Sequence, residues 1–495
     1  QGRAAHVHAL PEAARAEQHR VAQPAEARQQ FRTRRLALHQ QRILDAAVER
    51  GGGLLQGAVA GEQQEGASAA GGDGLAGDAD DRGGVGIGPL AEIALDAGYE
   101  IVGSDMTEGL MTQELEARGV AVSYDQSGDF LRTQHQATPI DWYIHTAALS
   151  ADHPELLAAY ELGIRTGKRD ELLARVIEDR QMKLIAVAGT HGKTSTTGMM
   201  VWAMKQLGLP VSYSVGTTLS WGPSGYFDPR SEYFVYECDE FDRNFLHFQP
   251  HLSLITALDY DHPDTYPTRE AYSQAFVEFL GQSTSSLLWE KDLRYLKHPD
   301  IAATYQAFDE LMNLSHITLP GDHTRHNAFL VQQALGQITR RDTHEIVDAI
   351  NSFPGTNRRF EKLTDHLYSD YGHHPAEITA TLQMARELSD HVVLVYQPHQ
   401  NVRQHEIRHL YTEPVFAGAQ QIYWLPTYQS RENKDLAVLT PVELTTHLDA
   451  SRVTLADLNS ELWTDIQQHL ANGHLVLCMG AGSIDAWIRT QTQQN

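Results

Sequence analysis

The sequence is poor in cysteine, in basic residues and in long apolar runs, and each shortage excludes a class of protein. Two cysteines among 495 residues, Cys238 and Cys478, are too few for a disulfide framework and suit a reducing compartment. The 39 lysines and arginines are outnumbered by 64 acidic residues, and the net charge of −25 argues against nucleic-acid binding. No apolar run approaches the roughly 18 residues that span a bilayer. We therefore expect a cytoplasmic protein without membrane insertion. A monomer or a weak homodimer is a separate expectation, which the composition does not decide.

The first 82 residues lack lysine, tyrosine, tryptophan, methionine and cysteine, and Phe31 is their only bulky aromatic residue. This composition buries too little apolar surface to offset the entropy of ordering the chain. We predict that residues 1–82 are a low-complexity extension that is disordered or non-native, as a wrong reading frame or start site would produce. The turn "GGVGIGP", from Gly83 to Pro89, has no strand-like run directly before it, although a dinucleotide-type turn needs one.

From Gly83 onward, short apolar runs typical of strands alternate with helix-like stretches, and this alternation predicts an α/β fold. The pattern divides into three blocks. The first continues to about Asp179. The second begins at "MKLIAVAG" and includes "EYFVYE" and "LSLITAL" as further buried strands. The third begins near "FPGTNRRFEKL" and contains "HVVLVYQP", "QQIYWLP" and "HLVLCMGAGSIDAWI".

The segment "KLIAVAGTHGKTSTTGMM", residues 183–200, has the order of a phosphate-binding site: an apolar strand, a glycine-containing turn and a helix. Backbone amides at such a turn converge on one point, where the helix dipole also favours an anion. Lys193 adds a positive charge, and the hydroxyl of Thr194 suits Mg²⁺. Only two residues separate Gly189 from Gly192, whereas the usual loop has four. A tight turn with a solvated lysine is the alternative, but the complete order of elements favours phosphate binding.

Carboxylates and a histidine follow the next two apolar runs. The run "EYFVYE" ends at Glu237, and "LSLITAL" leads into "DYDHPDTY", which contains His262. Because the carboxyl ends of parallel strands meet at one edge of a sheet, we expect Glu237 and His262 to lie near Lys193. Divalent cations that accompany nucleotide phosphates need such oxygen ligands. Further acidic residues follow the first run, namely Asp239, Glu240 and Asp242.

Eight segments occur in the order seen in the Mur ligase family, and residues 83–495 resemble that family. They are "GTHGKTSTT", "ECDEFD", "DYDHPDTY", "LPGDHTRHNA", "FPGTNRRFEKL", "SDYGHHPAEI", "YQPHQNVR" and "MGAGSI". The resemblance implies three α/β domains: a Rossmann-like UDP-sugar-binding domain at 83–179, a central P-loop ATPase-like parallel sheet at 180–352, and a Rossmann-like amino-acid-binding domain at 353–495.

The same resemblance implies an ATP- and Mg²⁺-dependent enzyme of peptidoglycan synthesis. The expected reaction joins UDP-N-acetylmuramate to an amino acid, with L-alanine favoured, through an acyl phosphate. Two alternatives stay open. One is a recycling ligase that attaches a tripeptide to the same sugar nucleotide. The other is a catalytically impaired relative that binds a nucleotide or a UDP-sugar without ligation.

Individual roles follow from the resemblance. The catalytic residues would be Lys193, His262, Arg359 and Asp370. ATP would contact Gly189, Thr190, His191, Gly192, Lys193, Thr194, Ser195, His323 and Asn327. Metal ions would bind Thr194, Glu237 and His262. The substrates would contact Gly84, Gly86, Ser104, Asp105, His373, His399 and Arg403.

Three residues depart from the family pattern. Ala257 and Thr324 stand where asparagines are usual, so two amide groups are missing near the nucleotide or metal site. Gln400 replaces an arginine in the amino-acid site, which leaves Arg403 as its guanidinium. One charge-assisted hydrogen bond contributes about 1.5–3 kcal/mol, so these differences bear on ATP use and on amino-acid specificity.

Overall fold

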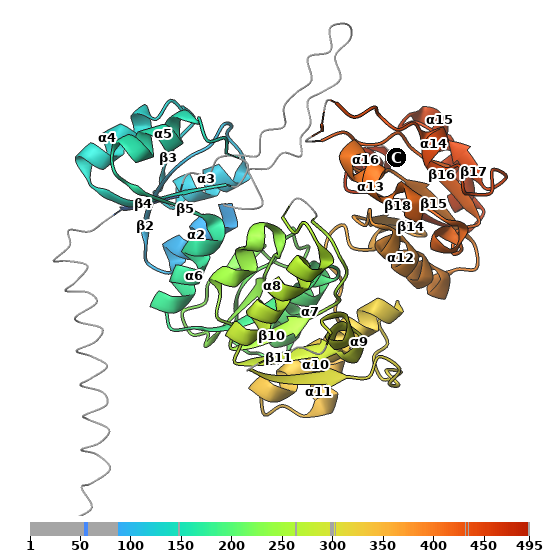
Figure 1. Cartoon of the computed structure of the whole chain (residues 1–495), viewed down its shortest axis with the longest axis horizontal. Helices are drawn as coiled ribbons and strands as arrows, with labels where there is room; N and C mark the ends of the chain where they lie inside the picture. The colour runs from blue at the N-terminus through green and yellow to red at the C-terminus, as the bar shows by residue number, and fades with distance from the viewer. Residues whose placement is uncertain are drawn as a thin grey trace, which may run out of the picture.

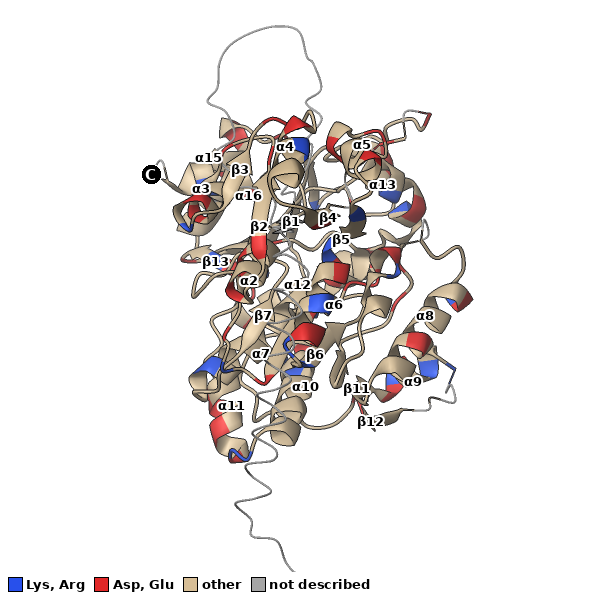
Figure 2. Cartoon of the chain, turned by 90° about the vertical axis from the view of Figure 1, so that its left-hand side faces the viewer, with Lys and Arg blue, Asp and Glu red and all other residues tan. Residues whose placement is uncertain are grey.

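The computed structural model describes residues 54–57, 88–146, 149–262, 265–297, 301, 303–430, 432–433 and 435–493. Three α/β units follow one another along the chain, and the first and third each lie against the central one (Figure 1). Within the described residues, no helix is long and apolar enough to cross a membrane. Figure 2 shows acidic and basic residues scattered over the described helices, and no continuous basic face is visible in that view.

The first unit is built on a parallel five-stranded sheet in the order β3-β2-β1-β4-β5. Its strands are β1 (Leu54–Gly57), β2 (Glu100–Ser104), β3 (Ala121–Ser123), β4 (Ile140–His145) and β5 (Arg165–Lys168). Its helices are α2 (Gly88–Asp96), α3 (Leu110–Ala117), α4 (Asp129–Ala137), α5 (Pro154–Glu161) and α6 (Arg169–Asp179).

Strand β1 supplies the first unit with a central strand from within the N-terminal extension, although it does not stand directly before the glycine-rich turn. It lies at the centre of the sheet and pairs in parallel with both β2 and β4. Without it, the facing edges of β2 and β4 would have no ladder partner, and buried backbone groups need one. A segment expected to be low-complexity extension therefore supplies a strand. The rest of that extension, and the turn with Gly84 and Gly86, lie outside the described residues.

The central unit has a seven-stranded sheet in the order β12-β11-β10-β6-β9-β7-β8, parallel except for β8. Its strands are β6 (Lys183–Ala188), β7 (Ser212–Ser214), β8 (Gly225–Tyr226), β9 (Tyr233–Glu237), β10 (Leu252–Ile255), β11 (Ser285–Trp289) and β12 (Thr304–Phe308). Its helices are α7 (Lys193–Gln206), the 3₁₀ segment η1 (Phe241–His247), α8 (Arg269–Gln282), α9 (Glu290–Tyr295), α10 (Asp322–Ile338) and α11 (Thr343–Asn351).

The third unit has a six-stranded sheet in the order β13-β14-β18-β15-β16-β17, with β13 antiparallel to β14. Its strands are β13 (Glu361–Thr364), β14 (Leu367–Asp370), β15 (Val392–Tyr396), β16 (Gln421–Trp424), β17 (Val453–Leu455) and β18 (Leu475–Met479). Its helices are α12 (Pro375–Leu388), α13 (Asn401–Ile407), η2 (Arg408–Leu410), η3 (Glu413–Phe416), α14 (Pro441–Leu444), α15 (Ser460–Ala471) and α16 (Ile484–Gln493).

The apolar strand β6 shows why these sheets are covered on both faces. Successive side chains of a strand point to opposite faces, and here each face meets its own core. Leu184 and Ala186 belong to the cluster that includes α8 and extends into the first unit. Ile185 and Val187 belong to the cluster that includes α7 and α10. The strand is therefore apolar at nearly every position, and its carboxyl end is held firmly where the next loop begins.

Candidate active site

A glycine-containing loop joins β6 to α7 at the carboxyl edge of the central sheet. Gly189 and Gly192 have φ values of +132° and +86°, which side-chain-bearing residues rarely adopt. A Cβ atom on Gly192 would lie 2.6 Å from the side-chain nitrogen of Asn327, so the loop packs directly against α10. Helix α7 starts at Lys193, where its unpaired amides and its dipole favour a bound anion.

Hydrogen bonds attach this loop to the segment after β10. The Thr190 amide donates to the carbonyl of Ala257 over 2.7 Å, and its hydroxyl donates to the carbonyl of Asp259 over 2.7 Å. The Tyr272 hydroxyl lies 2.6 Å from the same Thr190 oxygen. Ala257 contributes only its backbone here, so the lack of an asparagine side chain at this position leaves the support of the loop in place.

Lys193 is held by a buried carboxylate. Its Nζ atom donates to Glu240 Oε2 over 2.7 Å and to the carbonyl of Gly189 over 2.8 Å, and Asp239 lies 3.8 Å away. Burial disfavours the charged amine, but the negative charges of Glu240 and Asp239 outweigh it and raise the pKa of Lys193. The amine therefore stays protonated, as a ligand for phosphate oxygens must.

The side chains that could bind a metal ion form two neighbouring groups. Thr194 Oγ1 donates to Glu237 Oε1 over 2.8 Å, because β6 and β9 are adjacent and both end at this edge. The second group consists of Asp239, Glu240 and His262, whose ligand atoms all lie within 4.8 Å of one another. Carboxylate and hydroxyl oxygens beside a phosphate-binding loop fit a divalent cation such as Mg²⁺. His262 thus stands with Asp239 and Glu240 rather than with Thr194 and Glu237.

The third unit contributes Arg359 and Asp370. The guanidinium of Arg359 lies over the ring of Tyr371, and its Nη2 atom is 3.4 Å from Thr194 Oγ1. Asp370, at the end of β14, accepts hydrogen bonds from the amides of Phe360 at 2.7 Å and Gly372 at 2.8 Å. Burial raises the pKa of Asp370 to about 6, although the nearby charge of Arg359 opposes the shift.

The residues expected at the amino-acid site also gather between the central and third units. Arg403, on α13, contacts His373 Nε2 and lies 3.4 Å from Asp261 Oδ1 of the central unit. The ring of His399 stacks on Tyr428 and meets His373 edge-on, with ring centroids 5.7 Å apart in each case. Burial lowers the pKa of His373, so this imidazole is neutral.

The remaining expected residues lie on either side of the phosphate-binding loop, in the first unit and on α10 of the central unit. Ser104, at the carboxyl end of β2, donates to the buried Glu155 over 2.7 Å, and Asp105 is buried beside it. Asn327 is buried in α10 next to the loop glycine. His323, also on α10, lies 3.3 Å from the Thr324 hydroxyl, which occupies the position of the missing asparagine.

Four supporting residues carry no clear sequence signal. Glu240 was one of several acidic residues in "ECDEFD", and nothing marked it as the partner of Lys193. Tyr272 reaches the loop from α8. Glu377 and His374, at the start of α12, lie beside His191 of the loop. The adjacent histidines in "GHHP" were the available hint for His374, but only the packing of two units brings them to the loop.

Fold and site together define an ATP-dependent ligase: a phosphate-binding loop, carboxylates on adjoining strands and an arginine from another unit. Residues 82–181 match the description "Mur ligase family, catalytic domain", and residues 187–298 match "Mur ligase middle domain". The UDP-N-acetylmuramate–L-alanine ligase of Carboxydothermus hydrogenoformans is 30% identical over 444 residues, covering 81% of this chain and 93% of the relative. The corresponding ligase of Clostridium perfringens is 29% identical over 441 residues, covering 81% and 94%. The chain belongs to the Mur ligase family.

Solved structures agree in fold. The UDP-N-acetylmuramate–alanine ligase of Thermotoga maritima has a TM-score of 0.63 at 21% identity, covering 83% of this chain and 97% of its own. A murein peptide ligase from Psychrobacter arcticus has a TM-score of 0.57 at 18% identity, covering 89% and 98%. At these identities the likeness concerns architecture, and it confirms the expected α/β fold.

The raised pKa of Asp370 predicts a pH-dependent contribution to stability. The folded value of about 6 exceeds the ordinary 3.8, so the folded chain binds this proton more tightly than the unfolded chain does. The protonated carboxyl therefore favours folding below about pH 4, and this contribution is lost as pH rises through about 6. At ~1.36 kcal/mol per pKa unit, the loss is at most about 3 kcal/mol.

The comparison is between the wild-type chain and Asp370→Asn, whose amide does not titrate in this range. The free energy of unfolding, from urea denaturation, should fall in the wild type relative to the variant between about pH 4 and pH 7. The two proteins have different baselines because the two backbone amides donate to different oxygens of Asp370, and asparagine has an NH2 group in place of one of these acceptors. Parallel pH curves would contradict the assignment.

Proposed function

We propose that the chain is an ATP-dependent ligase that joins the lactyl carboxylate of UDP-N-acetylmuramate to the amino group of L-alanine. ADP and phosphate are released, and the product enters peptidoglycan synthesis. The observation that carries the proposal is the reach of the third unit to the phosphate-binding loop, where Arg359 lies 3.4 Å from Thr194. The relatives that cover most of the chain bear the name of this activity, which supports the choice of substrates.

The first step is phosphoryl transfer. A carboxylate oxygen of the sugar nucleotide attacks the γ-phosphorus of ATP, and ADP leaves with the electrons of the broken bond. Negative charge on the transferred group requires nearby positive charge. Lys193 supplies it from the loop and Arg359 from the third unit. Thr194 and Glu237 would hold one Mg²⁺, and His262 would hold a second. Both ions would neutralise further negative charge on the phosphates.

The second step is amide formation. The amine of L-alanine attacks the acyl carbon, phosphate leaves with one oxygen of the former carboxylate, and the nitrogen loses a proton. Asp370 positions the amino group, and His373, His399 and Arg403 hold the amino-acid carboxylate. Arg403 and Asp261 face each other across the boundary between two units, 3.4 Å apart. Closure of this boundary protects the acyl phosphate from water.

The sugar nucleotide occupies the first unit. Ser104 and Asp105 stand at the carboxyl end of β2, the edge at which open parallel sheets bind ligands. His323 and Asn327 lie at the adenine end of ATP. The two cysteines are buried and free, which suits a cytoplasmic location. We expect a monomer or a weak homodimer.

Replacement of Lys193 tests the reaction. With ATP, Mg²⁺, UDP-N-acetylmuramate and L-alanine, wild-type protein should release phosphate, and Lys193→Ala should lower kcat/KM by at least about 10²–10³-fold because a transition-state charge is lost. Release should depend on L-alanine and not on a tripeptide. The measurement is continuous phosphate detection with each acceptor in turn.

Two further variants make this test specific. Lys193→Ala leaves Glu240 buried without its lysine partner, so Lys193→Ala/Glu240→Gln removes both charges and avoids an uncompensated buried carboxylate. Lys297→Ala removes a lysine whose side chain is 78% exposed and should keep full activity. Retained activity in the double variant, or phosphate release with tripeptide alone, would overturn the proposal.

Gln400 offers a test of amino-acid recognition. Gln400 directly precedes α13 with a φ of +61°, and its backbone amide donates a hydrogen bond to the Tyr428 carbonyl over 2.8 Å. Gln400→Arg adds a guanidinium beside Arg403, where the alanine carboxylate is expected. A charge-assisted bond of about 1.5–3 kcal/mol should lower KM for L-alanine by at least about 10-fold.

The matched control is Gln468→Arg, which adds the same charge on the exposed face of α15. Steady-state kinetics with varied L-alanine and saturating ATP should show an unchanged KM in this control. An unchanged KM in Gln400→Arg would place the amino-acid carboxylate elsewhere.

A further inference from the structure

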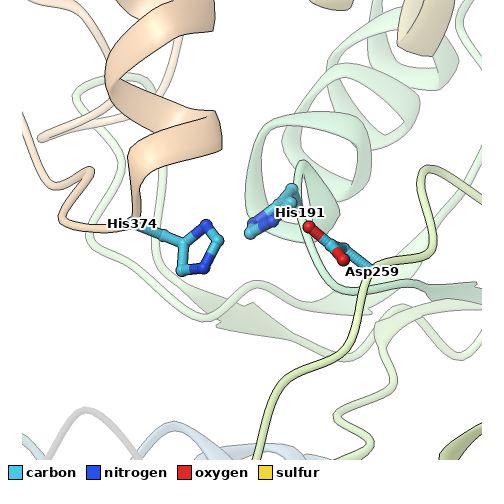
Figure 3. A group of neighbouring side chains, drawn as sticks. All are labelled: His191, Asp259 and His374. Carbon is cyan, nitrogen blue, oxygen red and sulfur yellow. The ribbon is translucent and has the colours of Figure 1, made fainter. Parts of the chain in front are cut away.

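Two histidines and an aspartate converge at the boundary between the central and third units. His191 belongs to the phosphate-binding loop, and Asp259 belongs to the segment after β10. His374 directly precedes α12. Their ligand atoms all lie within 4.8 Å of one another. Figure 3 shows the three side chains approaching from separate segments of the chain, with both imidazoles and the carboxylate directed toward a common region.

The environment of His191 resembles that of a metal-binding histidine. Its Nδ1 atom lies 3.4 Å from Glu377 Oε1, and this carboxylate fixes the orientation of the ring. The other ring nitrogen, Nε2, is buried and has no hydrogen-bond partner. Buried polar atoms are usually paired, so an unpaired nitrogen on a ring that lies beside two further potential ligands requires an explanation. A carboxylate behind one nitrogen and a metal ion at the other is a common arrangement.

The other two ligands are held on well-supported backbone. The Asp259 amide donates to Thr190 Oγ1 over 2.8 Å, and Thr190 directly precedes His191. Asp259 Oδ1 accepts from the amide of Tyr260 over 2.8 Å, which fixes the carboxylate. The His374 amide donates to Glu377 Oε2 over 3.0 Å, and Glu377 also faces His191. The Glu377 carboxylate thus contacts the ring of His191 and the backbone of His374, whose Nδ1 atom accepts from the amide of Ala376.

We propose that His191, Asp259 and His374 bind one divalent transition-metal ion of the Zn²⁺ type, which joins the phosphate-binding loop to the third unit. Two imidazoles and one carboxylate suit this class of ion, and three protein ligands leave a position for water. Mg²⁺ prefers oxygen ligands and belongs instead to the oxygen-rich groups beside Lys193. The site stands on its own residues and does not depend on the ligase proposal.

Zinc titration of the full-length protein tests the site. The protein is first freed of metals with a chelator and then titrated with Zn²⁺ in excess Mg²⁺, which occupies the oxygen-rich groups. Isothermal calorimetry should show one tightly bound Zn²⁺ per chain. His374→Asn and Asp259→Asn should each weaken binding by about 100-fold or more. Asparagine at position 374 can still cap α12, so the helix is retained.

Glu377→Gln tests the aligning carboxylate. Glutamine keeps the capping role of this residue at the start of α12 but loses the charge beside His191. Zinc affinity should fall by about 10–100-fold, as it does when an outer carboxylate is removed from a metal-bound histidine. Circular dichroism and thermal melting of the apo proteins show that each variant folds.

Two histidine-to-asparagine controls locate the ion. His344→Asn changes an exposed residue of α11 and should leave zinc binding unchanged. His262→Asn alters the neighbouring group with Asp239 and Glu240 and should also leave it unchanged. The proposal is overturned if the wild type binds no stoichiometric Zn²⁺, if His374→Asn and Asp259→Asn bind as tightly as the wild type, or if only His262→Asn loses the ion.

Hydrogen exchange then tests the link between the two units. Zn²⁺ should slow exchange in the loop around His191 and in the first turn of α12 together, and His374→Asn should abolish both effects. Protection of the loop alone would contradict a metal bridge between the units.

Discussion

The ion pair between Lys193 and Glu240 is the constraint on which the site depends. Glu240 is completely buried, and its carboxylate lies 2.7 Å from the lysine amine. The Tyr266 hydroxyl donates to its backbone carbonyl over 2.6 Å, so the residue is held by the surrounding core. Breaking a buried pair by removing one partner is strongly destabilising, by about 3–5 kcal/mol. The lysine is therefore charged and fixed before any phosphate arrives.

A second constraint is the division of the site between units. The central sheet provides the loop, the oxygen ligands and the lysine, whereas Arg359, Asp370 and Arg403 belong to the third unit. Phosphoryl transfer thus requires the two units to meet. This arrangement suits a reaction with a water-sensitive intermediate, because the groups that complete the site arrive together with the protein surface that excludes water.

Much of the fold could be predicted from the sequence. The apolar run before Gly189 became β6, and the helix after it became α7, because glycines and a change of periodicity mark both ends. The contact between Thr194 and Glu237 follows from the same logic, because Glu237 ends β9 and Thr194 stands at the start of α7, just after the loop that follows the neighbouring parallel strand β6. These features can be predicted from the local sequence, because they do not depend on how the three units pack together.

Other features depended on information that local patterns do not carry. His262, in the segment after β10, lies with Asp239 and Glu240, which follow β9, and the sequence pattern does not show which of the acidic residues after β9 it would meet. His374 and Glu377 reach His191 only because the third unit packs against the loop. Strand β1 was missed because its four residues lie in a segment whose overall composition is typical of disorder.

The acyl phosphate is the central claim of the mechanism, and isotope transfer tests it most directly. UDP-N-acetylmuramate labelled with heavy oxygen in its lactyl carboxylate is incubated with ATP, Mg²⁺, L-alanine and the protein. Phosphate is then analysed by mass spectrometry. If the carboxylate attacks the γ-phosphorus, each released phosphate carries one labelled oxygen. Phosphate without label, formed together with the amide, would contradict the account.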